Sequence, residues 1–193
     1  KENSKPVMGF SDTTSLLSFL YKNDIASAIF APTVQTIGRI DNLDMIFDVL
    51  SGQPNQTINL TGAKVIKDGS SVDAPIFAVT LSVFMSLIGT PYFPDLKGHI
   101  LFIEDIGEEL SHLDRMLWQL NEVCPFSALA GLVFGEFVDL KDTGRPFGLN
   151  FEEIIQKYAN ELSLPVLINA PIGHGSHIFP VHLGRKASRS YCS

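Results

Sequence analysis

Three side chains that could together break an acyl bond each stand at the end of an apolar run. Ser11 follows the first run, Glu104 ends a later one, and His174 comes shortly after the last. A serine nucleophile, a histidine base and an orienting carboxylate are the parts of a serine hydrolase. The residue types therefore indicate acyl-transfer chemistry, in the chain order serine, glutamate, histidine.

The segment around Ser11 has the pattern of a strand that turns sharply into a helix. Gly9 stands two residues before the serine, and a helical pattern starts at Thr13. A serine on such a turn exposes its hydroxyl, and the N–H groups that follow, beginning with that of Asp12, can stabilise an oxyanion. Thr13 replaces the usual second glycine. The simpler interpretation, in which Ser11 or Asp12 only caps the helix, stays open.

His174 and Glu104 complete the catalytic hypothesis. As a neutral imidazole, His174 would take the proton of the Ser11 hydroxyl and later return it to the leaving amine. Glu104 would fix the tautomer of His174 and stabilise the imidazolium. The alternatives are that Glu104 is a solvated or capping residue and that His174 only belongs to a turn.

A rival interpretation assigns His174, His177 and His182 to a metal ion. Histidines with nearby carboxylates can bind zinc. Glycines and a proline interrupt this segment, so one helix cannot present all three side chains, and the His-Glu-x-x-His pattern is missing from the sequence. We therefore do not expect a metal ion at these histidines.

The segments that must position these residues alternate between strand-like and helical patterns. This alternation is typical of an α/β fold, in which ligand-binding groups gather beyond the carboxyl ends of strands. In the first helix we expect Leu16, Leu17 and Leu20 to face the core, and Asp105 to belong to the acidic first turn of a later helix. Strands are expected over 6–10, 27–31, 99–104, 128–134 and 165–169, and helices over 13–22, 43–51, 81–88, 110–123 and 151–162.

A change in composition divides the chain. Residues 52–62 are polar and contain glycine and proline, so we place a boundary or long connection there. Residues 1–55 are assigned to the end of an N-terminal domain that carries the nucleophile. Residues 56–193 are assigned to a C-terminal domain that carries Glu104 and His174.

Composition limits the classes of partner. The 193 residues have a formal net charge of −7 and are 45% hydrophobic. Without a cluster of Lys or Arg, we expect neither nucleic acid nor an anionic membrane as a partner, because both need a concentrated basic surface. The longest apolar run, Ala74–Ile88, is short for a membrane span. Cys124 and Cys192 lie far apart and no leader pattern is visible, which favours a reducing, cytoplasmic location.

Five short motifs follow one another along the chain. They are Pro6–Leu16 with Gly-Phe-Ser-Asp at its centre, Gly89–Gly98, Ile100–Asp105, Asp114–Leu117, and Leu164–Val166 before Gly173-His174. In this order they resemble the motifs of the serine LD-carboxypeptidase family, which includes muramoyltetrapeptide carboxypeptidases and microcin C self-immunity peptidases. The resemblance runs through most of the chain, and five ordered motifs are far more specific than one.

The resemblance implies that Ser11, Glu104 and His174 form a catalytic triad, the same residues that their chemistry selects. It implies a peptidase that works through an acyl-enzyme, without metal or organic cofactor, on an amide near a free carboxylate. The substrate would be the LD-bond of a muropeptide in cell-wall recycling or, alternatively, a microcin-like peptidyl-nucleotide. It also implies a homodimer, and the end of a flavodoxin-like N-terminal domain followed by a mixed α/β C-terminal domain.

The chain departs from the family pattern in two places. Members carry about a hundred further residues ahead of the nucleophile, an ordinary domain length, including a loop that gives one oxyanion donor. Residues Ala78–Thr80 read Ala-Val-Thr where members have Gly-Gly-Asn in a loop that lines the cleft. A truncated or inactive relative that only binds therefore stays open. An arginine for the substrate carboxylate is expected, but Arg39, Arg115 and Arg145 are more simply surface residues.

Overall fold

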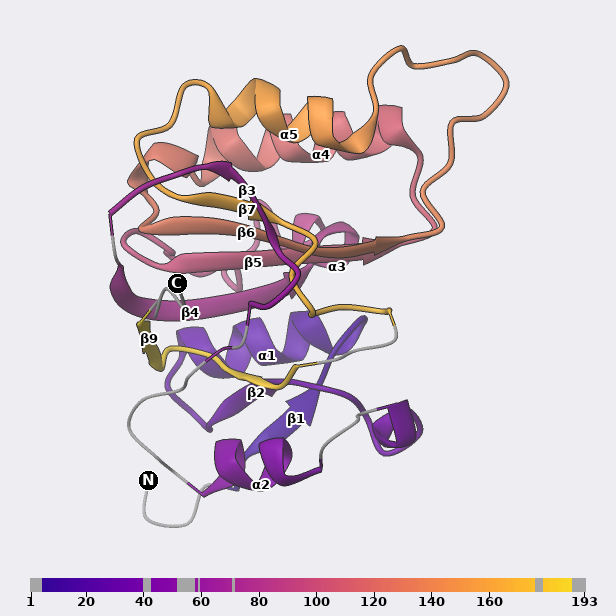
Figure 1. Ribbon diagram of the computed structural model, residues 1–193. Coiled ribbons are helices and arrows are strands. Elements are labelled where there is room, and N and C mark those ends of the chain that lie inside the picture. The colour runs from indigo at the N-terminus through magenta and orange to yellow at the C-terminus, as the bar shows by residue number, and fades with distance from the viewer. Residues whose placement is uncertain are drawn as a thin grey trace.

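Two sheets form the frame of the molecule. The computed structural model describes residues 5–39, 43–51, 58, 60–70, 72–175 and 179–188. One sheet has six strands and the other has three. Helices α4 and α5 lie along one face of the larger sheet, and α1 lies between the β4 edge of that sheet and the smaller sheet (Figure 1).

The larger sheet has the strand order β3-β7-β6-β5-β4-β9. Strands β4 to β7 are parallel, whereas β3 and β9 run antiparallel to their neighbours. Parallel strands covered on both faces are apolar along their length, and their carboxyl ends meet at one edge. The strands are β3 (Lys64–Lys67), β4 (Asp73–Thr80), β5 (Ile100–Ile106), β6 (Gly131–Val138), β7 (Val166–Ile168) and β9 (Lys186–Ser188).

The helices over the larger sheet follow from their sequence patterns. Helix α5 (Phe151–Ala159) begins with a capping box, in which the Asn150 side chain accepts from the Glu153 N–H and the Glu153 side chain accepts from the Asn150 N–H. The short helix α3 (Leu81–Met85) follows β4 directly, and a 3₁₀ turn, η2 (Phe126–Ala128), precedes β6. Helix α4 (Leu110–Val123) buries one stripe at helical spacing, made of Leu113, Met116, Leu117 and Leu120.

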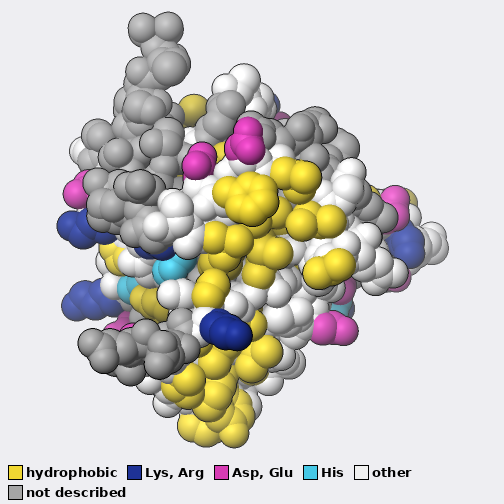
Figure 2. All heavy atoms as spheres, turned by 90° about the horizontal axis from the view of Figure 1, so that it is seen from below, with side chains coloured by type: hydrophobic (Ala, Val, Ile, Leu, Met, Phe, Trp, Pro, Cys, Tyr) yellow, Lys and Arg dark blue, Asp and Glu magenta, His cyan; other side chains and the backbone are white. Residues whose placement is uncertain are grey.

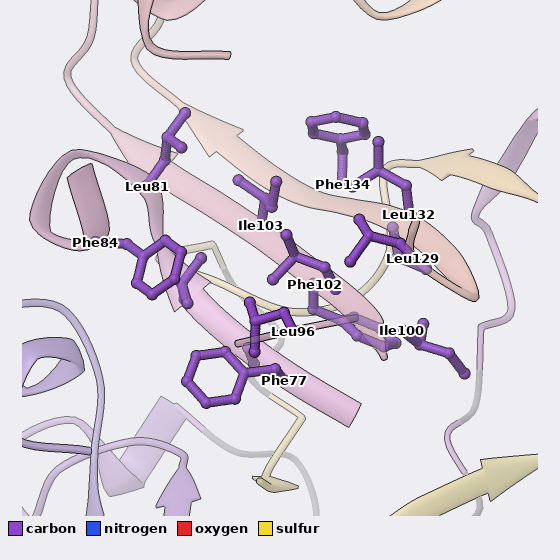
Figure 3. Close-up of a cluster of buried hydrophobic side chains, with 14 of the residues drawn as sticks. Phe77, Leu81, Phe84, Leu96, Ile100, Phe102, Ile103, Leu129, Leu132 and Phe134 are labelled. Carbon is purple, nitrogen blue, oxygen red and sulfur yellow. The ribbon is translucent and has the colours of Figure 1, made fainter. Parts of the chain in front are cut away.

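The main core lies between β4, β5, β6 and the helices that cover them. Figure 3 shows part of it, with Phe77 of β4 and Phe84 of α3 close together. Their ring centroids are 5.9 Å apart, and both side chains are fully buried. Closely packed interiors allow little side-chain or backbone displacement. The strand ends that carry Thr80 and Glu104 are therefore held in place by a packed core.

The smaller sheet carries the Ser11 segment. Strand β1 (Val7–Gly9) pairs in parallel with β2 (Ala28–Phe30), and β2 pairs antiparallel with β8 (Val181–His182). Helix α1 (Thr13–Lys22) follows Ser11 closely, and η1 (Ile37–Arg39) and α2 (Asp44–Leu50) come after β2.

The expectation of an α/β fold is confirmed, and the helices expected over residues 13–22 and 110–123 have those bounds. The other expected elements differ by a few residues at their ends. Strands β3, β4, β8 and β9 were not predicted. β8 comes from the expected C-terminal domain yet joins the sheet of the expected N-terminal one. The division at residue 55 and the flavodoxin-like form of the first domain stay predictions, and residues 52–57 and 59 of the expected boundary lie outside the described part.

Three expectations about side chains are wrong. Leu16 is 47% exposed, because it lies on the face of α1 that points away from the core. Ala78 and Val79 are buried inside β4 rather than in a loop that lines a cleft. Asp105 belongs to the buried end of β5, not to the first turn of α4. Among the described helices, none has both the length and the apolar character needed to cross a membrane.

Candidate active site

Glu104 and His174 form a hydrogen-bonded pair at the carboxyl edge of the larger sheet. Glu104 lies near the end of β5, and His174 lies in the loop that follows β7. The His174 Nδ1 and Glu104 Oε2 atoms are 2.6 Å apart, and the two side chains are 13% and 1% exposed. A carboxylate on Nδ1 places the proton there and leaves Nε2 to accept another. This is the base-and-orienter pair of the sequence hypothesis.

Two glycines allow the His174 loop to approach Glu104. Gly173 has φ of +129°, and a Cβ on it would lie 2.9 Å from both Cβ and Oε2 of Glu104. A Cβ on Gly135 of β6 would lie 2.2 Å from the Ile172 carbonyl oxygen. Contacts this short leave no space for a methyl group. The glycines therefore set the distance between the histidine loop and the sheet.

Ser11 lies on the sharp turn that its sequence context predicts. Its φ is +57°, in the left-handed region that a non-glycine residue rarely adopts. Gly9 packs against the turn, since a Cβ there would lie 2.7 Å from the Thr13 Cγ2 atom. The Thr14 N–H donates to the Ser11 carbonyl oxygen at 2.8 Å, which starts α1 at once. Strained backbone at such a turn is characteristic of functional positions.

The end of β1 reaches the histidine. The rings of Phe10 and His174 have centroids 4.8 Å apart, so the residue before Ser11 packs directly on the imidazole. Segments more than 160 positions apart in the sequence thus meet at this point. The Ser11 turn therefore lies beside the pair of His174 and Glu104, and the joint catalytic role of the three residues stays a prediction.

The capping interpretation of Asp12 does not hold. Asp12 is the N-cap residue of α1, but its side chain makes no capping hydrogen bond. Within the described residues, we find no acceptor for its backbone N–H. A backbone N–H directly after a serine on such a turn is the group that the oxyanion hypothesis requires.

Two further side chains lie at this edge, Thr80 and Asp105, and the sequence hypothesis gave neither of them a contact with the proposed triad. The Thr80 hydroxyl donates to Glu104 Oε1, and the Thr80 side chain is buried. Asp105 is 2% exposed and accepts from the N–H and the hydroxyl of Ser82. Burial raises the pKa of Asp105, while the bonds from Ser82 and Ile106 lower it in part. The sequence could have pointed to Thr80 and Asp105 only through their position, since each residue follows a buried strand segment.

The metal interpretation gains no support from the described residues. They contain no group of three or more His, Cys, Asp or Glu side chains that could hold a metal ion. His182 lies on β8, where burial and the charge of Arg185 lower its pKa, and His177 lies outside the described residues. Arg115 and Arg145 are exposed, and the side chain of Arg39 is not described.

The C-terminal part of the chain matches a known family. Residues 74–188 match the model described as the LD-carboxypeptidase C-terminal domain. This match covers more than half of the chain and includes Glu104 and His174. The chain belongs to the LD-carboxypeptidase family.

Relatives of the whole chain agree with this assignment. The chain is 27% identical over 193 residues to a Bacillus subtilis protein named "probable murein peptide carboxypeptidase", covering 97% of the chain and 60% of that protein. The crystal structure of muramoyltetrapeptide carboxypeptidase from Oxalobacter formigenes superimposes with a TM-score of 0.79 at 28% identity, covering 96% of the chain and 65% of that structure.

A microcin C7 self-immunity protein shares the fold. Its structure superimposes with a TM-score of 0.80 at 17% identity, over 96% of the chain and 64% of that structure. At this identity the likeness shows the fold alone. The chain spans about three fifths of the length of the relatives that it matches, so the activity of a whole relative comes to it only as a proposal.

Proposed function

We propose that this chain carries the catalytic residues of a serine carboxypeptidase of the LD-carboxypeptidase type. The observation that carries the proposal is the 2.6 Å hydrogen bond between His174 and Glu104, formed beside the strained turn of Ser11. Ser11, Glu104 and His174 are the proposed triad, and the Asp12 N–H is one oxyanion donor. The proposal includes no metal and no organic cofactor.

The reaction follows from the roles of these groups. The Ser11 Oγ attacks the carbonyl carbon of the scissile amide while His174 Nε2 takes the hydroxyl proton. Glu104 stabilises the imidazolium, and the Asp12 N–H stabilises the oxyanion of the tetrahedral intermediate. The imidazolium then gives its proton to the leaving amine, which departs and leaves an acyl-enzyme. Water, deprotonated by His174, attacks the ester, and the proton returns to Ser11 as the acid product leaves.

The proposed substrate is a muropeptide with an LD-bond close to a free carboxylate. The relatives at 27% and 28% identity are named for murein peptide and muramoyltetrapeptide substrates. A peptidyl-nucleotide substrate rests on fold likeness at 17% identity and is the weaker candidate. A homodimer, a cytoplasmic location and the domain division at residue 55 belong to the same proposal.

Hydrolysis of a defined tetrapeptide tests the function. The purified chain is incubated with an L,D-linked muramoyl tetrapeptide, its L,L diastereomer and an aminoacyl sulfamoyl adenosine, with and without a chelator. We expect release of the terminal D-residue from the first compound only, independent of chelator and abolished by Ser11→Ala. Chelator-sensitive hydrolysis that survives Ser11→Ala would support the metal interpretation. Tight binding of the tetrapeptide without turnover would support a relative that only binds.

A further inference from the structure

Thr80 stands where two parts of the site meet. It is the last residue of β4 and the N-cap residue of α3, and its side chain is 2% exposed. A threonine at an N-cap commonly accepts a hydrogen bond from a first-turn N–H with its side chain. The Thr80 side chain makes no such bond. Its hydroxyl is directed to Glu104 Oε1 instead.

Asp105 performs the capping that Thr80 does not. Its Oδ2 accepts from the Ser82 N–H at 2.7 Å, and its Oδ1 from the Ser82 hydroxyl at 3.1 Å. Asp105 is adjacent to Glu104 in β5, so neighbouring carboxylates have separate tasks. Asp105 satisfies the start of α3, which leaves the Thr80 hydroxyl available for Glu104.

Thr80 also connects Glu104 to the helix that follows the nucleophile. The Thr80 N–H donates to Thr14 Oγ1 at 3.2 Å, and the Thr14 N–H donates to the Ser11 carbonyl oxygen at 2.8 Å. Thr14 is 1% exposed. A continuous series of hydrogen bonds therefore runs from the Ser11 turn through Thr14 and Thr80 to Glu104, and from Glu104 Oε2 to His174 Nδ1.

We infer that Thr80 is a positioning residue for the proposed triad. Its hydroxyl orients the Glu104 carboxylate so that Oε2 faces His174. Its N–H donates to the Thr14 hydroxyl oxygen, which joins Thr80 to the helix that follows Ser11. A buried carboxylate needs donors on both oxygens, because unsatisfied charge is costly away from water. Thr80 supplies the donor for the oxygen that His174 does not use. The inference rests on the proposed function for its catalytic meaning, but the orientation of Glu104 can be measured without turnover.

The test compares Thr80→Val, which keeps the side-chain shape and removes the hydroxyl, with Thr80→Ser, which keeps the hydroxyl. The control is Thr90→Val, which makes the same chemical change at a hydroxyl that donates to the Leu87 carbonyl oxygen and accepts from the Tyr92 N–H. The first measurement is the proton NMR signal of the His174 Nδ1–H, which appears far downfield when it bonds to a carboxylate. We expect this signal to shift or disappear in Thr80→Val, and to stay in Thr80→Ser and Thr90→Val.

The second measurement is the kinetics of tetrapeptide hydrolysis. We expect kcat of Thr80→Val to fall on the order of 10–100-fold, the effect of one hydrogen bond to a charged group, with KM changed less than about twofold. Thr80→Ser should recover most of the loss. An unchanged Nδ1–H signal in folded Thr80→Val would overturn the inference. If Thr80→Val does not fold, Thr80→Ala removes the hydroxyl without added bulk and receives the same test.

The two proposals fail in different ways. If the parent chain shows the downfield signal but hydrolyses none of the test substrates, the proposed function fails and the NMR comparison still decides the role of Thr80. If the parent chain is active and Thr80→Val keeps both its signal and its kcat, the function stands and the role of Thr80 is wrong.

Discussion

The Ser11 segment, by which we mean the described residues from 5 to 51, is less buried than the sheet that carries Glu104 and the loop that carries His174. β1 and β2 have three residues each, whereas β4 and β6 have eight. Figure 2 shows hydrophobic side chains gathered on the underside of the molecule, where Figure 1 places α2 and β1. The exposed large hydrophobic residues of the Ser11 segment are Leu16, Ile25, Val34, Leu43, Phe47 and Leu50.

This difference indicates how the two parts of the site are held. The pair of Glu104 and His174 is positioned by a closely packed core and by two glycines, Gly135 and Gly173, that let the histidine loop pack directly on the sheet. The Ser11 turn is positioned by a strained φ, by the Phe10 contact with His174 and by the link from Thr14 to Thr80. Regions with less buried apolar surface open locally at a lower free energy. We therefore expect substitutions near Ser11 to affect activity more than stability, and substitutions in the sheet to affect both.

Removal of the nucleophile should have the largest effect. In Ser11→Ala, kcat for the tetrapeptide should fall by roughly 10⁶-fold, as for nucleophile removal in other serine peptidases. The free energy of unfolding should not decrease, because the hydroxyl makes no hydrogen bond to the described residues. Steady-state kinetics and urea unfolding measure both quantities. Ser86→Ala, which removes an exposed hydroxyl bonded to the Val83 carbonyl oxygen, is the control and should keep full activity.

Substitution of the orienting carboxylate should have the second-largest effect. Glu104→Gln should lower kcat by about 10⁴-fold, because the amide does not hold the tautomer of His174 that catalysis needs. The pair of Glu108, just before α4, and His112, in its first turn, gives a control that is less buried, with Oε2 and Nδ1 2.5 Å apart. Equal losses of kcat in Glu104→Gln and Glu108→Gln would contradict a specific role for the buried pair.

The third-largest effect should come from adding a methyl group to the closely packed sheet. Gly135→Ala places a methyl group 2.2 Å from the Ile172 carbonyl oxygen, so the free energy of unfolding should fall by about 1–3 kcal/mol. Gly38→Ala is the matched change in the Ser11 segment, where a Cβ meets no atom within 4 Å, and it should be neutral. Urea denaturation of both variants decides the comparison. An unchanged free energy of unfolding in Gly135→Ala would show that the sheet is not packed as closely as described.

Loss of the hydrogen bonds by which Asp105 caps α3 should lower the free energy of unfolding by a similar or smaller amount than Gly135→Ala. Asp105→Asn turns an NH₂ group toward a Ser82 or Ile106 donor, so the free energy of unfolding should fall by about 1–3 kcal/mol. Asp73→Asn, at an exposed position, should change it by less than about 0.5 kcal/mol.

The loss of stability in Asp105→Asn, relative to the parent chain, should also depend on pH. Because burial raises the pKa of Asp105 above the usual 3.8, the folded chain binds the proton more tightly than the unfolded chain. The contribution of that proton to stability is full below pH 3.8 and is lost as the pH rises through the raised pKa. The difference in unfolding free energy between the parent chain and Asp105→Asn should therefore narrow as the pH rises from 3.8. A difference that widens over this range would contradict the direction of the shift.

The sequence predicts elements well where one periodic pattern is strong. The stripe of α4 and the sharp start of α1 after Ser11 could be placed to the residue. Strands β3, β8 and β9 could not, because they are two to four residues long and edge strands carry too few residues to show alternation. Their existence depends on tertiary pairing with β7, β2 and β4. Strand β4 was also missed, because its apolar run continues directly into α3, and a continuous apolar run does not distinguish a strand from a helix.

The candidate site shows the same division between local and tertiary information. Ser11, Glu104 and His174 could be selected because each has a reactive side chain at the end of an apolar run. Thr80 could not, because its hydroxyl gains its role only from the Glu104 oxygen that β5 brings beside it. Asp105 was assigned to α4 because acidic residues near a helix start are common there, whereas the structure gives it to α3, a helix that precedes it in the sequence.

The most direct test of the account is covalent labelling of the serine. The folded chain is treated with a fluorophosphonate, digested and analysed by mass spectrometry. We expect one labelled site, Ser11, with labelling abolished in Ser11→Ala and strongly slowed in His174→Ala and Glu104→Gln. Label on another residue, or labelling of Ser11 at the same rate when His174 is removed, would contradict the proposal that these three residues act together.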